Sequence, residues 1–235
     1  MKISAIVLAG GKGSRMNSDI QKQYLPLCGK PVLYYALQAF QRSSVDEIIL
    51  VVGNGRIKNM SEEEYCKKEL IDHYHFNKAK QVVIGGSERY NSVINGLKAI
   101  QNKTDYVLIH DGARPCITVE LIERCIQDVV DYNACVAAVP VKDTIKMVDS
   151  KGYAASTPDR NTLWQIQTPQ CFEYNLIQKA YDDMIIDTQK SNITDDAMVV
   201  ERYSGNKVKM TYSSYKNMKI TTPEDLQIAE AFLFS

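Results

Sequence analysis

A glycine-rich loop with nearby cations follows the first apolar stretch of the chain. Its glycines and positive side chains are Gly10, Gly11, Lys12, Gly13, Arg15 and, a little further on, Lys22. Glycines permit backbone conformations in which successive N–H groups converge on one anion. Because lysine and arginine supply charge in the same short span, the loop indicates a binding site for phosphate groups.

Two familiar phosphate-binding motifs do not fit this loop. A Walker A loop needs Gly-Lys-Ser/Thr after four intervening residues, and the sequence lacks it. The dinucleotide fingerprint needs a glycine where Met16 stands and an acidic residue where Gly53 stands. These mismatches argue against a kinase or a dehydrogenase. The structural alternative is a plain glycine turn between a strand and a helix.

A second loop of small residues, Gly85–Ser87, follows another apolar stretch, and Arg89 stands just beyond it. Backbone groups in such a loop can read the edge of a pyrimidine, and the loop leaves little room for a purine. The alternative is a simple turn with Arg89 at the start of a helix.

The third loop, His110–Pro115, places charged residues after an apolar strand. Asp111 could hold Mg²⁺, because hard cations prefer carboxylate oxygens, although a lone aspartate in this position also forms turns. Arg114 is expected to face a phosphate or to pair with a carboxylate of its own loop. His110 is expected to be a packed, hydrogen-bonded histidine and not a catalyst.

Apolar strands alternate with helices over the first 140 residues. Strands are expected at 3–9, 48–52, 81–84, 106–109 and 135–139, and helices after Pro31 and Ser61, at 91–100 and near 119–130. This alternation predicts an α/β fold with a mostly parallel sheet and crossover helices on both faces. Ligands of such sheets bind outside the carboxyl ends of the strands, where all three loops are expected.

The alternation stops between Val141 and Pro169. Short strands are expected at 144–148, 153–155 and 163–166 with no helix between them, which predicts a β-rich arm that leaves the main body. Further helices are expected at 173–182, after Thr194 as N-cap, and after Thr222 as N-cap, with a strand at 208–211. Asp195 and Asp196 fit the first turn of a helix, and metal binding is the less favoured alternative.

Composition narrows the class of protein. Lys+Arg and Asp+Glu both number 28, so no global charge points to nucleic acid. The six cysteines have no zinc-finger spacing and are expected to be reduced thiols, mostly filling the core. No apolar run reaches membrane-spanning length, and Met1 leads directly into a strand, so no signal peptide is expected. We expect a cytoplasmic protein.

The motifs, taken together, resemble a known family. GGKGSRM followed by KQYLPLCGKPVLYYAL is similar to the opening of sugar nucleotidyltransferases. The resemblance narrows to 2-C-methyl-D-erythritol 4-phosphate cytidylyltransferases through GGSERYNSVINGL, HDGARPC, PVKDTIK, DRNTLWQIQTPQ, TDDAMVVE and KITTPEDL, in that order along the chain. It covers nearly the whole chain. Many relatives have Pro-Ala-Ala-Gly where this chain has Leu8 to Gly11, and alanine where it has Gly112; both changes keep the backbone path.

The resemblance implies transfer of CMP from CTP to 2-C-methyl-D-erythritol 4-phosphate with release of pyrophosphate, a step of isoprenoid precursor biosynthesis in the methylerythritol phosphate pathway. It implies Mg²⁺, held by Asp111. The implied catalytic residues are Arg15, Lys22, Arg160 and Lys219. The implied CTP contacts are Ala9, Gly10, Gly11, Lys12, Gly13, Gly85, Gly86, Ser87, Arg89, Ser92 and Gly112. The implied contacts to the second substrate are Asp111, Arg114, Thr144, Arg160, Thr168 and Lys219.

The resemblance also implies one Rossmann-like domain over residues 1–235, with the arm at 141–169 exchanged between the subunits of an obligate homodimer. Arg160 would then serve the neighbouring subunit's site. Three alternatives stay open: a ribitol 5-phosphate cytidylyltransferase, a hexose-1-phosphate nucleotidyltransferase, and a nucleotide-binding protein without catalysis. The first shares most of the motifs. The second is usually longer. The third is disfavoured by the four implied catalytic cations.

Overall fold

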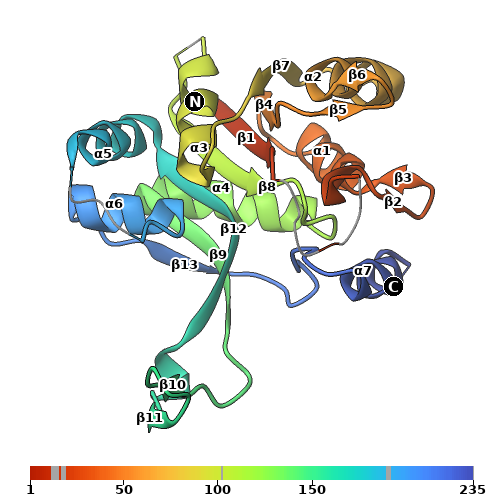
Figure 1. Ribbon diagram of the computed structural model, residues 1–235. Coiled ribbons are helices and arrows are strands. Elements are labelled where there is room, and N and C mark those ends of the chain that lie inside the picture. The colour runs from red at the N-terminus through yellow and green to blue at the C-terminus, as the bar shows by residue number, and fades with distance from the viewer. Residues whose placement is uncertain (12–15, 17–19, 102, 189–191, 235) are drawn as a thin grey trace.

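A seven-stranded sheet forms the centre of the molecule (Figure 1). The computed structural model describes residues 1–11, 16, 20–101, 103–188 and 192–234. The strands lie in the order β13-β9-β12-β8-β1-β4-β7. In chain order they are β1 Ile3–Ala9, β4 Glu47–Val52, β7 Ala79–Ile84, β8 Tyr106–Asp111, β9 Ala134–Pro140, β12 Trp164–Glu173 and β13 Lys209–Tyr212. Within this sheet β12 runs antiparallel to both of its neighbours, and the other four strand pairs of the sheet are parallel.

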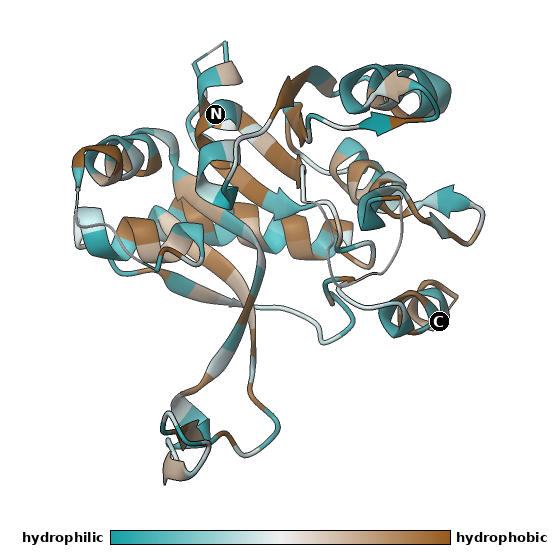
Figure 2. Cartoon of the chain, in the orientation of Figure 1, coloured by the Kyte–Doolittle hydropathy of each residue, from teal (hydrophilic) through white to brown (hydrophobic). Residues whose placement is uncertain are grey.

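Strands β1 and β4 are buried on both faces, which explains their continuous apolar sequences. Ile48, Leu50 and Val52 of β4 pack into one hydrophobic cluster. Ile49 and Val51 of the same strand pack into a second cluster on the opposite face. Figure 2 shows hydrophobic residues concentrated along these strands. The predicted fold class, an α/β protein with a mostly parallel sheet, is confirmed.

Helices cover both faces of the sheet (Figure 1). They are α1 Val32–Arg42, α2 Glu62–Tyr65 continued by the π-helical η3 Cys66–Asp72, α3 Arg89–Ala99, α4 Val119–Tyr132, α5 Tyr174–Ile186, α6 Asp196–Ser204 and α7 Glu224–Leu233. Side chains of α1, η3 and α4 pack into the first cluster, and those of α3, α5 and α6 pack into the second. A third, smaller cluster joins α7 to the start of α1. One short 3₁₀ helix, η2 Lys22–Tyr24, and two short antiparallel strand pairs also belong to the body of the molecule: β2 Pro26–Leu27 with β3 Lys30–Pro31, and β5 Arg56–Ile57 with β6 Met60–Ser61.

Two predicted helix caps are displaced by one residue. Asp195, and not Thr194, caps α6, because its side chain accepts from the N–H of Met198. Pro223 occupies the cap position of α7, where Asp225 accepts from the N–H groups of Thr221 and Thr222 instead. Aspartate satisfies free helix-end donors as well as threonine does, so at α6 the local sequence does not separate the two registers.

The arm projects from the sheet body (Figure 1), and its predicted range, 141–169, ends within β12, where Gln167 and Thr168 are buried in the main sheet. It carries β10 Met147–Val148 and β11 Ala154–Ser156, paired with each other, and the 3₁₀ turn η4 Arg160–Thr162. The third short strand that the sequence predicts is the beginning of the ten-residue β12, which runs from the arm back into the main sheet. Within the described residues, no helix combines the length and apolar character needed to cross a bilayer.

Five of the six cysteines are buried, as their predicted core-filling role requires.

Candidate active site

Four parallel strands end side by side along one edge of the sheet. Register pairs Leu8 with Asp111, Ala9 with Val52, and Val52 with Ile84. The loops that begin at Gly10, Gly53, Gly85 and Gly112 therefore lie next to one another. Because neighbouring strands are ~4.8 Å apart, the four strand ends span roughly 14 Å, enough for an extended nucleotide.

Asp111 lies at the centre of three cations. Lys219 Nζ is 2.9 Å from Asp111 Oδ2, Arg114 Nε is 3.6 Å from the same oxygen, and Arg89 Nε is 3.7 Å from Oδ1. We call these four residues the Asp111 cluster. Burial alone would raise the pKa of Asp111, but Lys219, Arg89 and Arg114 together hold that pKa well below its usual range. The carboxylate is therefore ionised at any physiological pH.

Arg89 also makes a two-pronged ion pair with a buried aspartate. Its Nη1 and Nη2 lie 2.8 and 2.7 Å from the carboxylate oxygens of Asp196, whose side chain is fully buried. The hydroxyl of Tyr181 donates to the same carboxylate at 2.6 Å. The amide oxygen of Gln170 accepts from the N–H groups of Asp196 and Ala197. Arg89 is thus held between Asp196 and Asp111, which fixes the start of α3 over the carboxyl edge.

The segment after β13 brings Lys219 to the site. Arg114 Nη1 donates to the carbonyl of Asn217 at 2.8 Å, and Asn217 Nδ2 donates to the carbonyl of Thr168 at 2.9 Å. The N–H of Ile220 donates to the carbonyl of Ala113. Lys219 therefore stands between two anchored neighbours, and with 39% of its side chain exposed it is the most open member of the Asp111 cluster. Arg114 pairs with the carboxylate of its own loop, the second of the two predicted possibilities.

His110 is fully buried and packs against Phe40. Its Nδ1 lies 3.0 Å from the hydroxyl of Thr168, which also accepts from the N–H of Asp111 at 3.0 Å. Burial lowers the pKa of His110 to about 3. The ring is therefore neutral, and the prediction of a packed, hydrogen-bonded histidine is confirmed. Thr168, predicted to touch substrate, lies 3% exposed and ties β12 to β8 through these bonds.

The glycines of the second loop permit close packing. A Cβ at Gly85 would lie 2.5 Å from Ser92 Oγ, and a Cβ at Gly86 would lie 2.2 Å from the Cβ of Asn91. Ser92 Oγ itself accepts from the N–H of Gly86 at 3.1 Å. Gly85, Gly86, Ser87, Arg89 and Ser92 therefore form one compact unit at the end of β7.

Lys22 approaches the same edge on η2. Gln23 donates through its side chain to the carbonyls of Ala9 and Gly11, which holds η2 against the end of β1. Lys22 itself is 9% exposed. Ala9, Gly10, Gly11 and Gly112 lie at the same strand ends, and Gly112 donates from its N–H to the carbonyl of Leu8.

Some predicted residues stand elsewhere. Thr144 is exposed on the arm, outside regular structure. Arg160 is also exposed on the arm, where its Nη1 donates to the carbonyl of Lys142 at 2.9 Å. Among the described residues, no hydrogen bond or ion pair joins Arg160 to the Asp111 cluster. Lys12, Gly13 and Arg15 lie outside the described residues.

Sequence reasoning missed three residues that hold the site together: Asp196, Gln170 and Asn217. Asp196 was considered only as a helix-end acid or a metal ligand, and its pairing with Arg89 joins positions 107 residues apart. Gln170 and Asn217 carry no charge and form no spacing motif. A buried, uncharged amide gives no local signal, although Gln170 does lie within a stretch that resembles the family.

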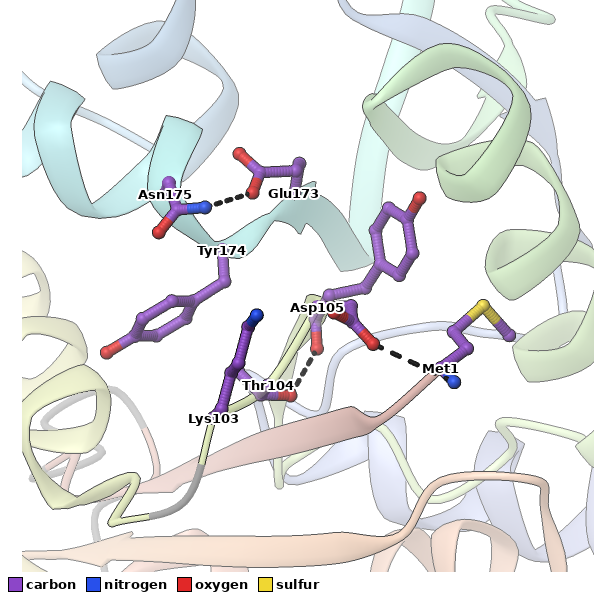
Figure 3. Close-up of a pocket in the computed structure, with 8 residues that line it drawn as sticks. Met1, Lys103, Thr104, Asp105, Glu173, Tyr174 and Asn175 are labelled. Atoms are coloured by element: carbon purple, nitrogen blue, oxygen red, sulfur yellow. Dashed lines mark hydrogen bonds and ion pairs between the residues drawn. The ribbon is translucent and has the colours of Figure 1, made fainter.

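A separate hollow lies at the opposite edge of the sheet, where β1 and β8 begin (Figure 3). It has a volume of about 410 Å³ and is lined by residues that include Lys103, Asp105, Glu173 and Tyr174. Asp105 accepts from the N–H of Lys2 at 2.7 Å, and Glu173 accepts from the side chain of Asn175. These carboxylates stabilise local backbone and side chains, so we assign this hollow no part in the chemistry.

A sheet whose carboxyl edge gathers a glycine loop, an ionised carboxylate and several cations defines an α/β enzyme that handles phosphorylated nucleotides, of the nucleotidyltransferase class. The chain belongs to the 2-C-methyl-D-erythritol 4-phosphate cytidylyltransferase family, whose model matches residues 3–235.

Named relatives support this assignment over the full length. A protein of Lachnospira eligens called 2-C-methyl-D-erythritol 4-phosphate cytidylyltransferase is 52% identical over 231 residues, covering 98% of both chains. One of the same name from Lachnoclostridium phytofermentans is 50% identical, covering 99% of this chain and 96% of its own. The crystal structure of 4-diphosphocytidyl-2C-methyl-D-erythritol synthase from Anaerococcus prevotii matches with a TM-score of 0.84 at 34% identity, covering 100% of this chain and 96% of that one.

Proposed function

We propose that this protein transfers CMP from CTP to 2-C-methyl-D-erythritol 4-phosphate and releases pyrophosphate. The observation that carries the proposal is the Asp111 cluster, at the carboxyl edge of the sheet in a chain of this family. A phosphate oxygen of the polyol attacks the α-phosphorus of CTP, a new O–P bond forms, and the bond to the β-phosphate oxygen breaks. No nucleophilic side chain is required.

The barrier to this reaction is mainly electrostatic. Two anions must meet, and the five-coordinate phosphorus carries additional negative charge, so fixed cations lower the barrier. In our proposal Lys22 and Arg15 stabilise that charge. Lys219 and Arg160 orient the attacking phosphate. Lys219 suits this task because it is half-exposed and held at 2.9 Å by an ionised carboxylate.

We assign the CTP contacts to the ends of β1 and β7 and the loops that follow them, which lie on one side of Asp111 in the strand order β8-β1-β4-β7. The end of β1 and the loop that follows it (Ala9 to Gly13) hold the triphosphate, and Gly112 lies beside them. Gly85, Gly86, Ser87 and Ser92 face the cytosine and ribose. Arg89 acts from α3, where Asp196 holds its guanidinium. Arg114, Thr144 and Thr168 complete the second substrate's site, Thr168 by fixing the backbone of Asp111.

Asp111 also fits Mg²⁺. Among the described residues, no group of three or more histidines, cysteines or acids is arranged to hold a metal. One ionised carboxylate is nevertheless sufficient, because Mg²⁺ usually binds through one or two carboxylates together with substrate phosphates. When bound, the metal would neutralise triphosphate charge.

The arm supports a homodimer as the active form. Large apolar side chains stand exposed on it: Ile145, Met147, Val148 and Tyr153 are 39%, 59%, 63% and 72% exposed. Covering such a surface with a second copy would remove it from water. In this proposal Arg160 enters the neighbouring subunit's site. A cytoplasmic location stays a prediction.

Pyrophosphate release tests the proposal. The purified protein is assayed with each of the four nucleoside triphosphates, and with 2-C-methyl-D-erythritol 4-phosphate or ribitol 5-phosphate as acceptor. We expect turnover with CTP and the methylerythritol substrate and at least tenfold lower kcat/KM for other pairs. Preference for ribitol 5-phosphate would reassign the acceptor. CTP binding without turnover on either acceptor would show a protein that binds nucleotide without catalysis.

A further inference from the structure

Glu62 is a buried carboxylate that the proposed reaction does not use. It is 2% exposed and is the first residue of α2. Its helix is capped by the preceding residue, Ser61, whose hydroxyl accepts from the N–H of Glu64. The Glu62 carboxylate is therefore not needed as a cap, and it points instead toward two neighbouring segments.

Each oxygen of this carboxylate accepts two hydrogen bonds. Oε1 accepts from Gly55 N at 3.1 Å and Gln21 Nε2 at 3.0 Å. Oε2 accepts from Gly53 N at 3.1 Å and the hydroxyl of Tyr24 at 3.0 Å. A carboxylate has about four acceptor positions, so all of them are filled, and every donor is neutral.

These four bonds connect the end of β4 to η2. Gly53 and Gly55 belong to the loop after β4, while Gln21 and Tyr24 flank Lys22 on both sides. The carboxylate lies close to that loop: a Cβ at Gly53 or at Gly55 would lie 2.6 Å from Glu62 Oε1, so a larger residue at either position would displace the carboxylate. The carboxylate thus holds the side chains of Gln21 and Tyr24, on either side of the lysine that the proposed function assigns to the transition state.

We propose that Glu62 is a positioning residue for Lys22. It acts by holding η2 at the carboxyl edge, where Gln23 provides a second attachment to the end of β1. A displacement of about 1 Å in a catalytic group can cost ~10²-fold in rate. This inference rests on the proposed function, because it requires that Lys22 contribute to turnover.

The first test is the Glu62→Gln variant. The amide keeps the shape but has one oxygen, so two of the four donors would face an NH₂ group. We expect kcat to fall ~10- to 100-fold with KM for CTP changed less than about threefold. Tyr24→Phe removes one donor and leaves the carboxylate, and we expect it to give a smaller loss of the same kind. If Glu62→Gln is too unstable to assay, Tyr24→Phe provides the measurement.

Ser61→Ala is the matched control. It removes the cap of the same helix and leaves the carboxylate and all four donors in place, at a cost of ~1 kcal/mol in stability. We expect normal kcat. A loss of kcat in Ser61→Ala equal to that in Glu62→Gln would mean that α2 stability, and not the carboxylate, controls the rate.

A double-mutant cycle with Lys22→Ala decides the route of action. If Glu62 acts through Lys22, Glu62→Gln should lower kcat by less than about twofold in the Lys22→Ala background. Fully additive losses would overturn the positioning role while the loss caused by Lys22→Ala still supported the proposed function. Normal turnover in Lys22→Ala alone would remove the proposed role of Lys22 and this inference with it.

Discussion

The sheet edge and the arm carry cations in opposite settings. In the Asp111 cluster, Arg114 is 8% exposed and each cation has a carboxylate within 4 Å. On the arm, Arg160 is exposed and its side chain donates to a backbone carbonyl of the arm itself. The first arrangement is complete within one chain. The second has its charge and its apolar surface turned outward.

The difference concerns preorganisation. Fixed charges in a buried setting stabilise developing charge without having to move during the reaction. An exposed arginine on an arm gains that property only when another surface surrounds it. We therefore expect substitutions at the sheet edge to act within their own subunit, and substitutions on the arm to act on a neighbour.

The largest loss is expected for Lys219→Ala. It removes the most open cation of the Asp111 cluster, and we expect kcat to fall ~10²–10³-fold, as for loss of one donor to a transition state. Steady-state pyrophosphate release measures it. Lys216→Ala is the control, since that exposed lysine lies on the same segment over the ring of Phe232. Equal losses in both variants would contradict a specific role for Lys219.

Arg160→Ala should lower kcat ~10²-fold, for the same electrostatic reason. Because Arg160 is proposed to act across subunits, mixing Arg160→Ala with Lys22→Ala protein should restore activity. Random reassortment gives half mixed dimers with one intact site each, or about a quarter of wild-type activity.

Native mass spectrometry of the mixture verifies subunit exchange. With exchange demonstrated, an inactive mixture would place Arg160 in its own subunit's site. Lys151→Ala, another substitution on the arm, should change neither the activity of the protein nor the exchange of its subunits.

The sequence predicts most of the fold because the buried parallel strands are continuous apolar stretches with helices between them. Ile3–Ala9 is predicted with the observed bounds. The second half of β12 is not predicted, because Pro169 lies within it and proline usually excludes a central strand. Packing between β8 and β9 overrides that local preference.

The site is partly predictable for a similar reason. Loops that follow parallel strands meet at one edge of the sheet. Asp111 and the glycine loops could therefore be placed at that edge from the order of strands and helices along the chain. The sequence did not predict which charged side chains form ion pairs with one another. Arg89 meets Asp196 only because α3 and α6 pack on the same face of the sheet, and no spacing within the sequence encodes that contact.

Asp196→Asn tests how much the ion pair between Arg89 and Asp196 contributes to the stability of the protein. Breaking a buried ion pair typically costs ~3–5 kcal/mol, and partial exposure of Arg89 reduces the expected loss to about 2 kcal/mol. Urea unfolding measures it. Glu201→Gln is the matched control, because it removes an acidic charge from an exposed position on the same helix and the loss should stay below ~0.5 kcal/mol. Similar losses in both variants would show that loss of an acidic charge from α6, and not the pair with Arg89, is responsible.

The last expected effect, no larger than that of Asp196→Asn, is a pH dependence of stability from His110. Its folded pKa, about 3, lies below the value of ~6.5 in an unfolded chain, so the unfolded state gains the proton first as the pH falls. The stability from the neutral ring is therefore complete above about pH 6.5 and declines toward pH 3, by at most ~1.4 kcal/mol per pH unit.

Urea unfolding of wild type and His110→Gln between pH 7 and pH 5 isolates this contribution. Asp111 does not titrate in that window, because its pKa lies below the window in the folded state and at ~3.9 in the unfolded state. We expect the variant to be less stable at pH 7 and to lose less on acidification. Parallel curves would mean that His110 binds a proton within the fold, and that its contacts with Thr168 and Phe40 do not require a neutral ring.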